Sequence, residues 1–174
     1  MDTKMEHDKN DDNEQVRIRE MTIDDFSTVF HMGEKLFTAD YSPSMYRTWD
    51  EYEITTLYNS DCDLCLVAEL DERLLGFALG TTVDKANSAW KYGYLVWLGV
   101  IPGLQKGGVG KKLFREVKRR MVEQGVRMMI IDTDADNEAG IRFFKKQGFN
   151  NIQQHVYMTL NLSRKPRRKK GRKE

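Results

Sequence analysis

The sequence is poor in cysteine, which limits the metal and redox chemistry open to it. Its 174 residues include two cysteines, Cys62 and Cys65, in the spacing CxxC. No second Cys or His pair lies nearby to complete a zinc site. A redox pair of this spacing normally precedes a helix, whereas Cys65 lies in the apolar run LCLVA, which is typical of a buried strand. We therefore predict no metal site and no redox centre.

Long hydrophobic segments are also missing. The longest nearly apolar run extends over 11 residues, from Tyr94 to Leu104, and glycine and proline interrupt it. A transmembrane helix needs about 20 apolar residues. The first 15 residues are acidic and polar, unlike a signal peptide. Together these features predict a cytoplasmic protein without a membrane span.

Neither positive nor negative charge dominates the chain, but the charged residues are unevenly distributed along it. The formal net charge is +1, and 32% of the residues are charged. Residues 1–15 contain six acidic residues, whereas residues 163–174 contain eight basic ones. Neither end has apolar periodicity, which predicts two disordered tails around one domain at 16–162. Two interpretations of the basic tail stay open: weak contact with nucleic acid or a ribosome surface, and a solubilising end.

Apolar periodicity predicts an α/β protein. The predicted strands lie at 16–18, on both sides of the turn LDER within 64–83, at 92–101, at 126–132 and at 152–162. The predicted helices begin after Thr22 and near Tyr46, and two more cover 111–124 and 137–148. The later strand–helix–strand order implies a parallel crossover, whereas the hairpin implies antiparallel strands. We expect a mixed six- to seven-stranded sheet with helices on both faces.

One loop is dense in glycine and lysine, the stretch LQKGGVGKK between a predicted strand and a predicted helix. Backbone amides at such a helix start can hold an anion. A P-loop would need a glycine where Gln105 stands and a hydroxyl where Lys112 stands. A dinucleotide-binding fingerprint would need a third glycine where Leu113 stands. Both nucleotide interpretations therefore fail at specific residues.

The remaining pattern is Gln105-x-x-Gly108-x-Gly110, which resembles the acyl-CoA loop of the GNAT superfamily of N-acyltransferases. The segment LGVIP precedes the loop and NEAGIRFFKKQGF follows the next strand, in the order found in that family. The resemblance covers residues 16–162 and is strongest over 94–149. It is closest to the ribosomal-protein alanine N-acetyltransferase type. It implies a GNAT-like fold and transfer of an acetyl group from acetyl-CoA to a primary amine by direct attack.

The resemblance also implies which residues bind acetyl-CoA. The backbone of 98–100 would pair with the pantetheine arm, on a strand that is bulged and splayed in the family. Gly99 would either form that bulge or relieve packing. Asn137 would hydrogen-bond the cofactor arm, cap a helix, or do both. The cofactor-binding candidates are Leu98, Gly99, Val100, Gln105, Lys106, Gly107, Gly108, Val109, Gly110, Lys111 and Asn137.

Catalysis by direct attack needs a base, an oxyanion donor and an acid. The oxyanion donor is expected to be a backbone N–H near Val100. The resemblance assigns the base to Asp132, where the family type has a glutamate, and Glu69 at the end of LCLVAE is the competing base. The tyrosine that serves as the acid in the family corresponds to Phe144, which cannot donate a proton. The candidate donors are Tyr157, His155 and Tyr94, unless the thiolate leaves unassisted.

The acceptor and two other functions stay open. The amine could belong to a protein N-terminus, a lysine or a small molecule. The missing tyrosine is compatible with a non-catalytic acyl-CoA-binding module, and the basic tail with a nucleic-acid accessory protein. Acceptor loops are expected at 38–60 and 84–91. Their aromatic residues (Tyr41, Tyr46, Trp49, Trp90) either line the acceptor site or pack within the protein. The sequence is compatible with both a monomer and a homodimer.

Overall fold

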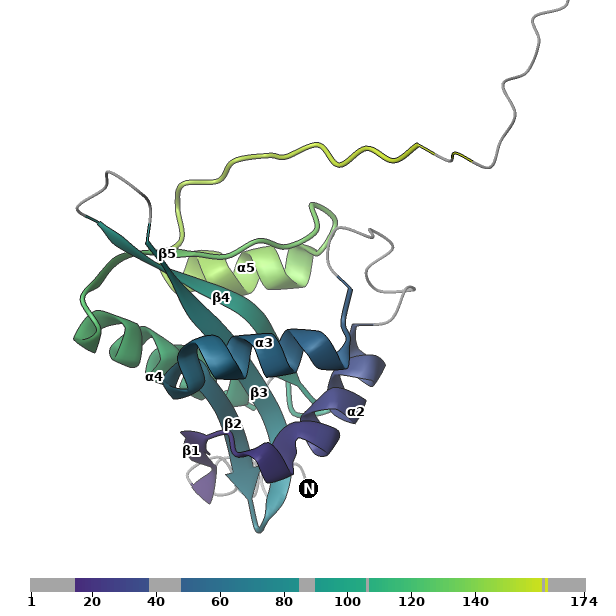
Figure 1. Ribbon diagram of the computed structural model, residues 1–174, viewed down its shortest axis with the longest axis vertical. Helices are drawn as coiled ribbons and strands as arrows, with labels where there is room; N and C mark the ends of the chain where they lie inside the picture. The colour runs from purple at the N-terminus through teal and green to yellow at the C-terminus, as the bar shows by residue number, and fades with distance from the viewer. Residues whose placement is uncertain (1–14, 38–47, 85–89, 106, 161, 163–174) are drawn as a thin grey trace, which may run out of the picture. The chain divides into compact units, whose positions relative to one another are not determined.

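Five strands of the chain form one sheet in which each strand lies beside its neighbour in sequence. The structure, a computed structural model, describes residues 15–37, 48–84, 90–105, 107–160 and 162 (Figure 1). The chain divides into two units, residues 1–134 and residues 135–174. The sheet belongs to the first unit. Its strands are β1 (Arg17–Glu20), β2 (Cys65–Leu70), β3 (Arg73–Asp84), β4 (Lys91–Val100) and β5 (Val126–Ile130).

The sheet is mixed, which confirms the predicted fold class. β1, β2, β3 and β4 pair antiparallel in turn, whereas β4 and β5 pair parallel. The turn between β2 and β3 consists of Asp71 and Glu72, both with positive φ, within the predicted LDER turn. The parallel pair is connected through α4 (Val109–Glu123), as the strand–helix–strand order predicted. Gly125, with a φ of 81°, follows this helix in the left-handed conformation expected at a helix end.

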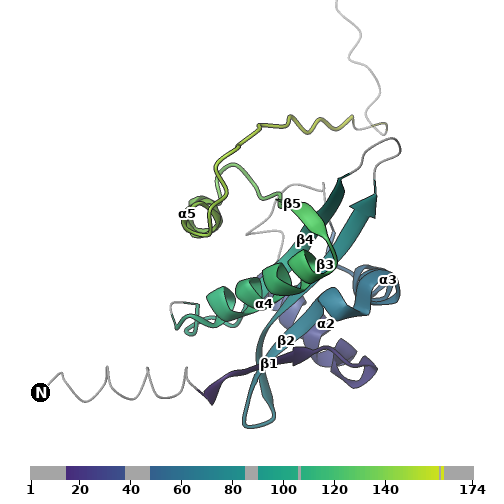
Figure 2. The same cartoon turned by 90° about the vertical axis from the view of Figure 1, so that its left-hand side faces the viewer.

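Helices cover both faces of the sheet, as predicted (Figure 2). α4 packs on one face, with Leu113, Val117 and Met121 buried. α2 (Phe26–Leu36) and α3 (Glu51–Asp61) pack on the other. The short 3-10 helix η1 (Ile23–Asp25) leads into α2 and η2 (Cys62–Leu64) leads into β2. Thr22 caps η1, which confirms the predicted helix start.

The core beneath α2 and α3 is rich in aromatic rings. The ring centroid of Trp49 lies 5.2 Å from that of Phe77 and 5.1 Å from that of Trp97. Of the aromatic residues expected in the acceptor loops, Trp49 therefore packs into the core. Tyr41 and Tyr46 lie outside the described residues.

The second unit contains the predicted helix α5 (Glu138–Lys146) but not the predicted final strand. Residues 150–160 form neither helix nor strand, and residue 161 is not described (Figure 1). Val156 and Met158 are both 84% exposed. Alternating apolar residues form a strand only beside a partner, and the described part of this unit contains no other strand. The described sheet therefore has five strands rather than six to seven.

The chain ends were predicted to be tails. Apart from Gln15, the acidic stretch 1–15 and the basic stretch 163–174 lie outside the described residues. Among the helices that the structure describes, none is long and apolar enough to cross a membrane.

Candidate active site

Strand β4 carries a bulge, but at Val96 rather than at Gly99. The register with β3 shifts between Leu95 and Trp97, so Val96 is the extra residue. Gly99 stays in register. A Cβ atom there would lie 2.8 Å from Cδ1 of Leu36 on α2, so glycine lets this side chain pack closely against β4. The interpretation of Gly99 as the bulge is therefore wrong, and its alternative, relief of packing, is confirmed.

Strands β4 and β5 part at Tyr94. Their parallel pairing runs from Lys91 to Tyr94 and ends at Ile130, where β5 also ends, whereas β4 continues to Val100. Beyond this fork β4 has β3 on one side and no described strand on the other. A strand edge of this kind offers backbone N–H and C=O groups to an extended ligand. Leu98, Gly99 and Val100 all lie on this stretch.

A tyrosine and an aspartate meet at the fork. The Tyr94 hydroxyl donates a hydrogen bond to Oδ1 of Asp132 over 2.6 Å. Tyr94 is the last residue of β4 paired with β5, and Asp132 follows β5 by two residues. Asp132 is exposed, so its carboxylate is open to water. The sequence predicted each residue separately but not their pairing; the parallel order of the two strands was the signal that could have revealed it.

The competing base, Glu69, lies in a different setting at the end of β2, which β3 separates from β4. Nε of Arg19 donates to Oε2 of Glu69 over 2.7 Å. The other guanidinium nitrogens donate to both carboxylate oxygens of Asp25, at 2.7 and 2.9 Å. The guanidinium lowers the pKa of Asp25, and the two carboxylates raise the pKa of Arg19. Glu69 is thus part of an ion-pair cluster that joins β1, β2 and η1.

The loop before α4 is tight and depends on glycine. The Gly107 N–H donates to the carbonyl of Leu104 over 2.9 Å, and a Cβ on Gly107 would lie 3.2 Å from that oxygen. Gly108 has a φ of 84°, a left-handed conformation that glycine adopts without strain. Nε2 of Gln105 donates to the carbonyl of Val100 over 3.4 Å, which joins the loop to the end of β4.

Helix α4 begins with open backbone donors. The Lys112 N–H makes the first i to i−4 bond of the helix, 3.0 Å long. The N–H groups of Val109, Gly110 and Lys111 precede it, and no side chain among the described residues caps this end. Such amides, together with the helix dipole, favour an anion. The exposed Lys111 adds positive charge to the same turn, and Lys106 lies outside the described residues.

The other predicted site residues belong to the second unit. Oδ1 of Asn137 accepts from the Gly140 N–H over 3.0 Å, so Asn137 caps α5. A Cβ on Gly140 would lie 2.6 Å from Nδ2 of Asn137, so this cap requires the glycine. Phe144 packs its ring edge-on against two neighbouring phenylalanine rings. His155 and Tyr157 are exposed, in the segment without helix or strand.

Known proteins share this sequence pattern and fold. Residues 27–149 match the family model described as the acetyltransferase (GNAT) family. An acetyltransferase of Pectobacterium atrosepticum is 25% identical over 139 residues, 79% of this chain and 89% of the relative. A solved aminoglycoside N-acetyltransferase in complex with CoA is 20% identical with a TM-score of 0.66, over 83% of this chain and 94% of that one. The NatC complex bound to Gag peptide and CoA is 18% identical with a TM-score of 0.66, over 80% of this chain and 87% of that one.

Proposed function

Because the chain belongs to the acetyltransferase (GNAT) family and is an acetyl-CoA-dependent N-acetyltransferase with an amine acceptor, we propose that its acceptor is the α-amino group of a protein N-terminus. Membership of an enzyme family sets aside the alternative of a non-catalytic acyl-CoA-binding module. The observation that carries the proposal is the exposed carboxylate of Asp132, held by Tyr94 where β4 and β5 part. The cytoplasmic location expected from the sequence is part of the same proposal.

A carboxylate is a weak base, and this limits the amines that it can serve. An α-amino group has a pKa of about 7.7–8.0, whereas a lysine side chain has one of about 10.4. Near neutral pH a useful fraction of α-amino groups is already uncharged, so an exposed carboxylate working through water suffices. A lysine or an aliphatic polyamine would demand a stronger base. The resemblance to the alanine N-acetyltransferase type supports the same acceptor.

Acetyl-CoA is proposed to bind along β4 beyond the fork and at the start of α4. The N–H groups at 109–111 would hold the pyrophosphate, because no described side chain caps them. Gly107 and Gly108 would let the backbone approach the phosphates closely. The backbone at 98–100 would pair with the pantetheine arm. The contact of Asn137 with that arm stays a prediction.

The proposed reaction removes two protons from the amine nitrogen and exchanges one bond. Asp132 accepts a proton from the ammonium group, directly or through one water. The neutral nitrogen then bonds to the acetyl carbon, while backbone N–H groups of β4 beyond the fork stabilise the oxyanion. The carbon–sulfur bond breaks, the thiolate departs, and the nitrogen releases its second proton to water. Tyr94 gives the thiolate its proton and regains one from Asp132, a role that Phe144 cannot fill.

The acceptor is tested by following thiol release from acetyl-CoA with matched peptides. One peptide has a free N-terminus and no lysine. A second has the same sequence with a blocked N-terminus and one internal lysine, and a polyamine serves as the small amine. We expect turnover with the first peptide and none with the other two. Turnover with the lysine peptide or the polyamine, and none with the free N-terminus, would contradict the assignment of the acceptor.

The proposed site of acetyl-CoA is tested by Gly108→Val. Valine would strain this left-handed backbone by about 1–3 kcal/mol and place a side chain where the pyrophosphate is proposed to bind, so the variant should bind CoA about tenfold to a hundredfold more weakly. Gly125→Val is the matched control, because Gly125 has a φ of 81° at the opposite end of α4 and open space around its Cβ position. It should suffer similar strain and keep its affinity for CoA. The CoA affinities of both folded variants are measured by isothermal titration calorimetry. Equal affinities would refute the assignment of the loop as the acetyl-CoA site.

A further inference from the structure

Positive charge is concentrated on helix α4. Its 15 residues include six lysines and arginines and two glutamates, a net charge of +4, whereas the whole chain has a net charge of only +1. The buried face of the helix, with Leu113, Val117 and Met121, packs on the sheet. Four of the six basic residues are exposed on its outer side: Lys111, Arg115, Lys118 and Arg119. Acetyl transfer as proposed above uses only the first of them, Lys111.

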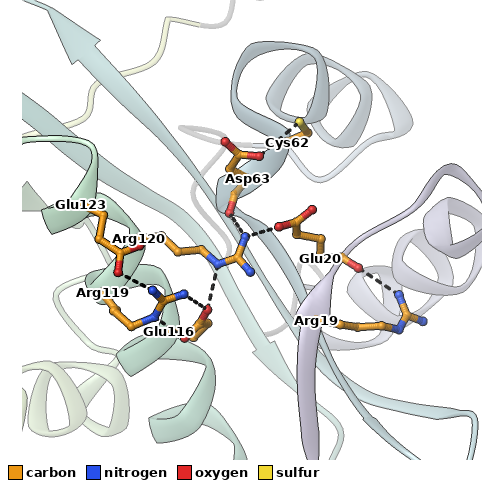
Figure 3. Close-up of polar contacts among 8 residues, drawn as sticks. All are labelled: Arg19, Glu20, Cys62, Asp63, Glu116, Arg119, Arg120 and Glu123. Atoms are coloured by element: carbon orange, nitrogen blue, oxygen red, sulfur yellow. Dashed lines mark hydrogen bonds and ion pairs between the residues drawn. The ribbon is translucent and has the colours of Figure 1, made fainter.

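Two of the six cations form ion pairs with three carboxylates around them (Figure 3). Arg119 pairs with Glu116 at 2.6 Å and with Glu123. Arg120 pairs with Glu116 at 2.9 Å and with Glu20 of β1 at 2.6 Å. Hydrogen bonds from the two arginines lower the pKa of Glu116 to about 2. The two carboxylates of the helix are thus ion-paired within this network rather than with the other cations of α4.

Three other cations form a stripe, which we define as Lys111, Arg115 and Lys118. Their spacing of i, i+4 and i+7 places them on one side of the helix. All three are exposed, and no hydrogen bond or ion pair joins them to another described residue. At 1.5 Å of rise per residue the stripe is about 10 Å long.

A shallow depression adjoins the stripe. It has a volume of about 350 Å³ and is lined by Arg115, Lys118, Arg119, Val122 and Glu123. Val122 is 63% exposed, so the depression combines a charged rim with an aliphatic surface. A ligand that carries both a chain of negative charges and flat, less polar groups matches this combination. Nucleotides have both properties.

We propose that the outer face of α4 binds the phosphate backbone of a nucleic acid. Each strand of a duplex carries about one phosphate per 3.4 Å, so a 10 Å stripe meets about three phosphates. The cations supply charge complementarity without fixed partners, which is how backbone contacts position a protein without reading sequence. This binding goes beyond acetyl transfer and does not depend on it.

The test measures fluorescence anisotropy of a labelled nucleic acid of about 20 nucleotides, as single-stranded RNA and as duplex DNA, over about 50–300 mM salt. The full chain is used with saturating acetyl-CoA, which occupies the proposed cofactor site. The double variant Arg115→Gln/Lys118→Gln should reduce the slope of log affinity against log salt by about 1.4 for RNA or 1.8 for duplex. The matched control Lys145→Gln/Lys146→Gln removes the same charge from α5 and should leave the slope near that of the wild type.

Several results would overturn the proposal. Equal losses in both double variants would show that net charge alone is responsible. Equal binding of polyglutamate at the same charge would refute the assignment to phosphate. Loss of all binding on adding acetyl-CoA would show that the nucleic acid had entered the cofactor site. Acetyl transfer by Arg115→Gln/Lys118→Gln should be unchanged, so a failure of the acetyl-transfer proposal and a failure of this one give different results.

Discussion

Among the acidic residues near the ends of strands, Glu69 and Asp132 have surroundings that differ. Glu69 is the penultimate residue of β2, its side chain is 20% exposed, and Arg19 holds it at 2.7 Å. Asp132 follows β5, is exposed, and accepts a hydrogen bond from the neutral hydroxyl of Tyr94 at 2.6 Å. Both residues fit the pattern of an acid near the end of an apolar strand, yet Glu69 is ion-paired with an arginine whereas Asp132 is exposed beside a phenol.

The difference lies in the partner of each carboxylate, and it is the reason why we propose Asp132 rather than Glu69 as the base. An arginine that binds two carboxylates at once favours their charged forms and fixes their positions. A phenol also orients a carboxylate, but it leaves the net charge in place and a face open to water. The parting of β4 and β5 beside Asp132 adds an open strand edge for an acyl donor. No such parting accompanies Glu69.

Removing the arginine should have the largest effect on stability. Arg19→Met leaves Asp25, whose side chain is only 11% exposed, without its cation. We expect the free energy of unfolding to fall by about 3 kcal/mol, since an uncompensated charge is left partly buried. Chemical denaturation measures the loss. Below the unfolding temperature the turnover number should stay near that of the wild type.

The control for this variant is Arg142→Met on α5, which breaks an exposed pair with Glu138. That pair should contribute about 0.5 kcal/mol or less. If Arg19→Met were as stable as this control, the cluster around Glu69 would not be the structural element described above. If it were stable but inactive, Glu69 would belong to the catalytic site.

Removing the phenol should have a smaller effect, and on catalysis rather than stability. Tyr94→Phe deletes the hydrogen bond to a charged group, worth about 1.5–3 kcal/mol, so we expect the turnover number to fall by about tenfold to a hundredfold. The KM for acetyl-CoA should change little. Tyr52→Phe is the matched control, because Tyr52 is 73% exposed on α3. Equal turnover in Tyr94→Phe and this control would remove Tyr94 from the mechanism.

Much of the fold could be predicted because local patterns decided it. The hairpin followed from two apolar runs around a polar turn, and α4 followed from apolar residues every three to four positions that end at Gly125. The loop was predicted from Gln105, Gly108 and Gly110. The structure adds the left-handed φ of Gly108 and the uncapped start of α4.

Other features depend on residues far apart in the sequence, and these were missed or wrong. Arg19 lies 50 residues from Glu69, so no local pattern indicates their ion pair. The bulge lies at Val96, because register is set by how β3 and β4 pair rather than by the position of a glycine. The segment 152–162 alternates like a strand, but alternation supplies no partner. The pairing of Tyr94 with Asp132 required knowing that β4 and β5 are adjacent and parallel.

The most direct test of the central claim is the rate of acetyl transfer to a peptide with a free N-terminus, measured side by side for Asp132→Asn and Glu69→Gln. Loss of a general base lowers a rate by about a hundredfold to ten-thousandfold, and we expect this of Asp132→Asn with its affinity for acetyl-CoA unchanged. Glu69→Gln should stay within about threefold of the wild-type rate while the protein is folded. A wild-type rate in Asp132→Asn, or an equal loss in folded Glu69→Gln, would contradict the assignment of Asp132 as the base.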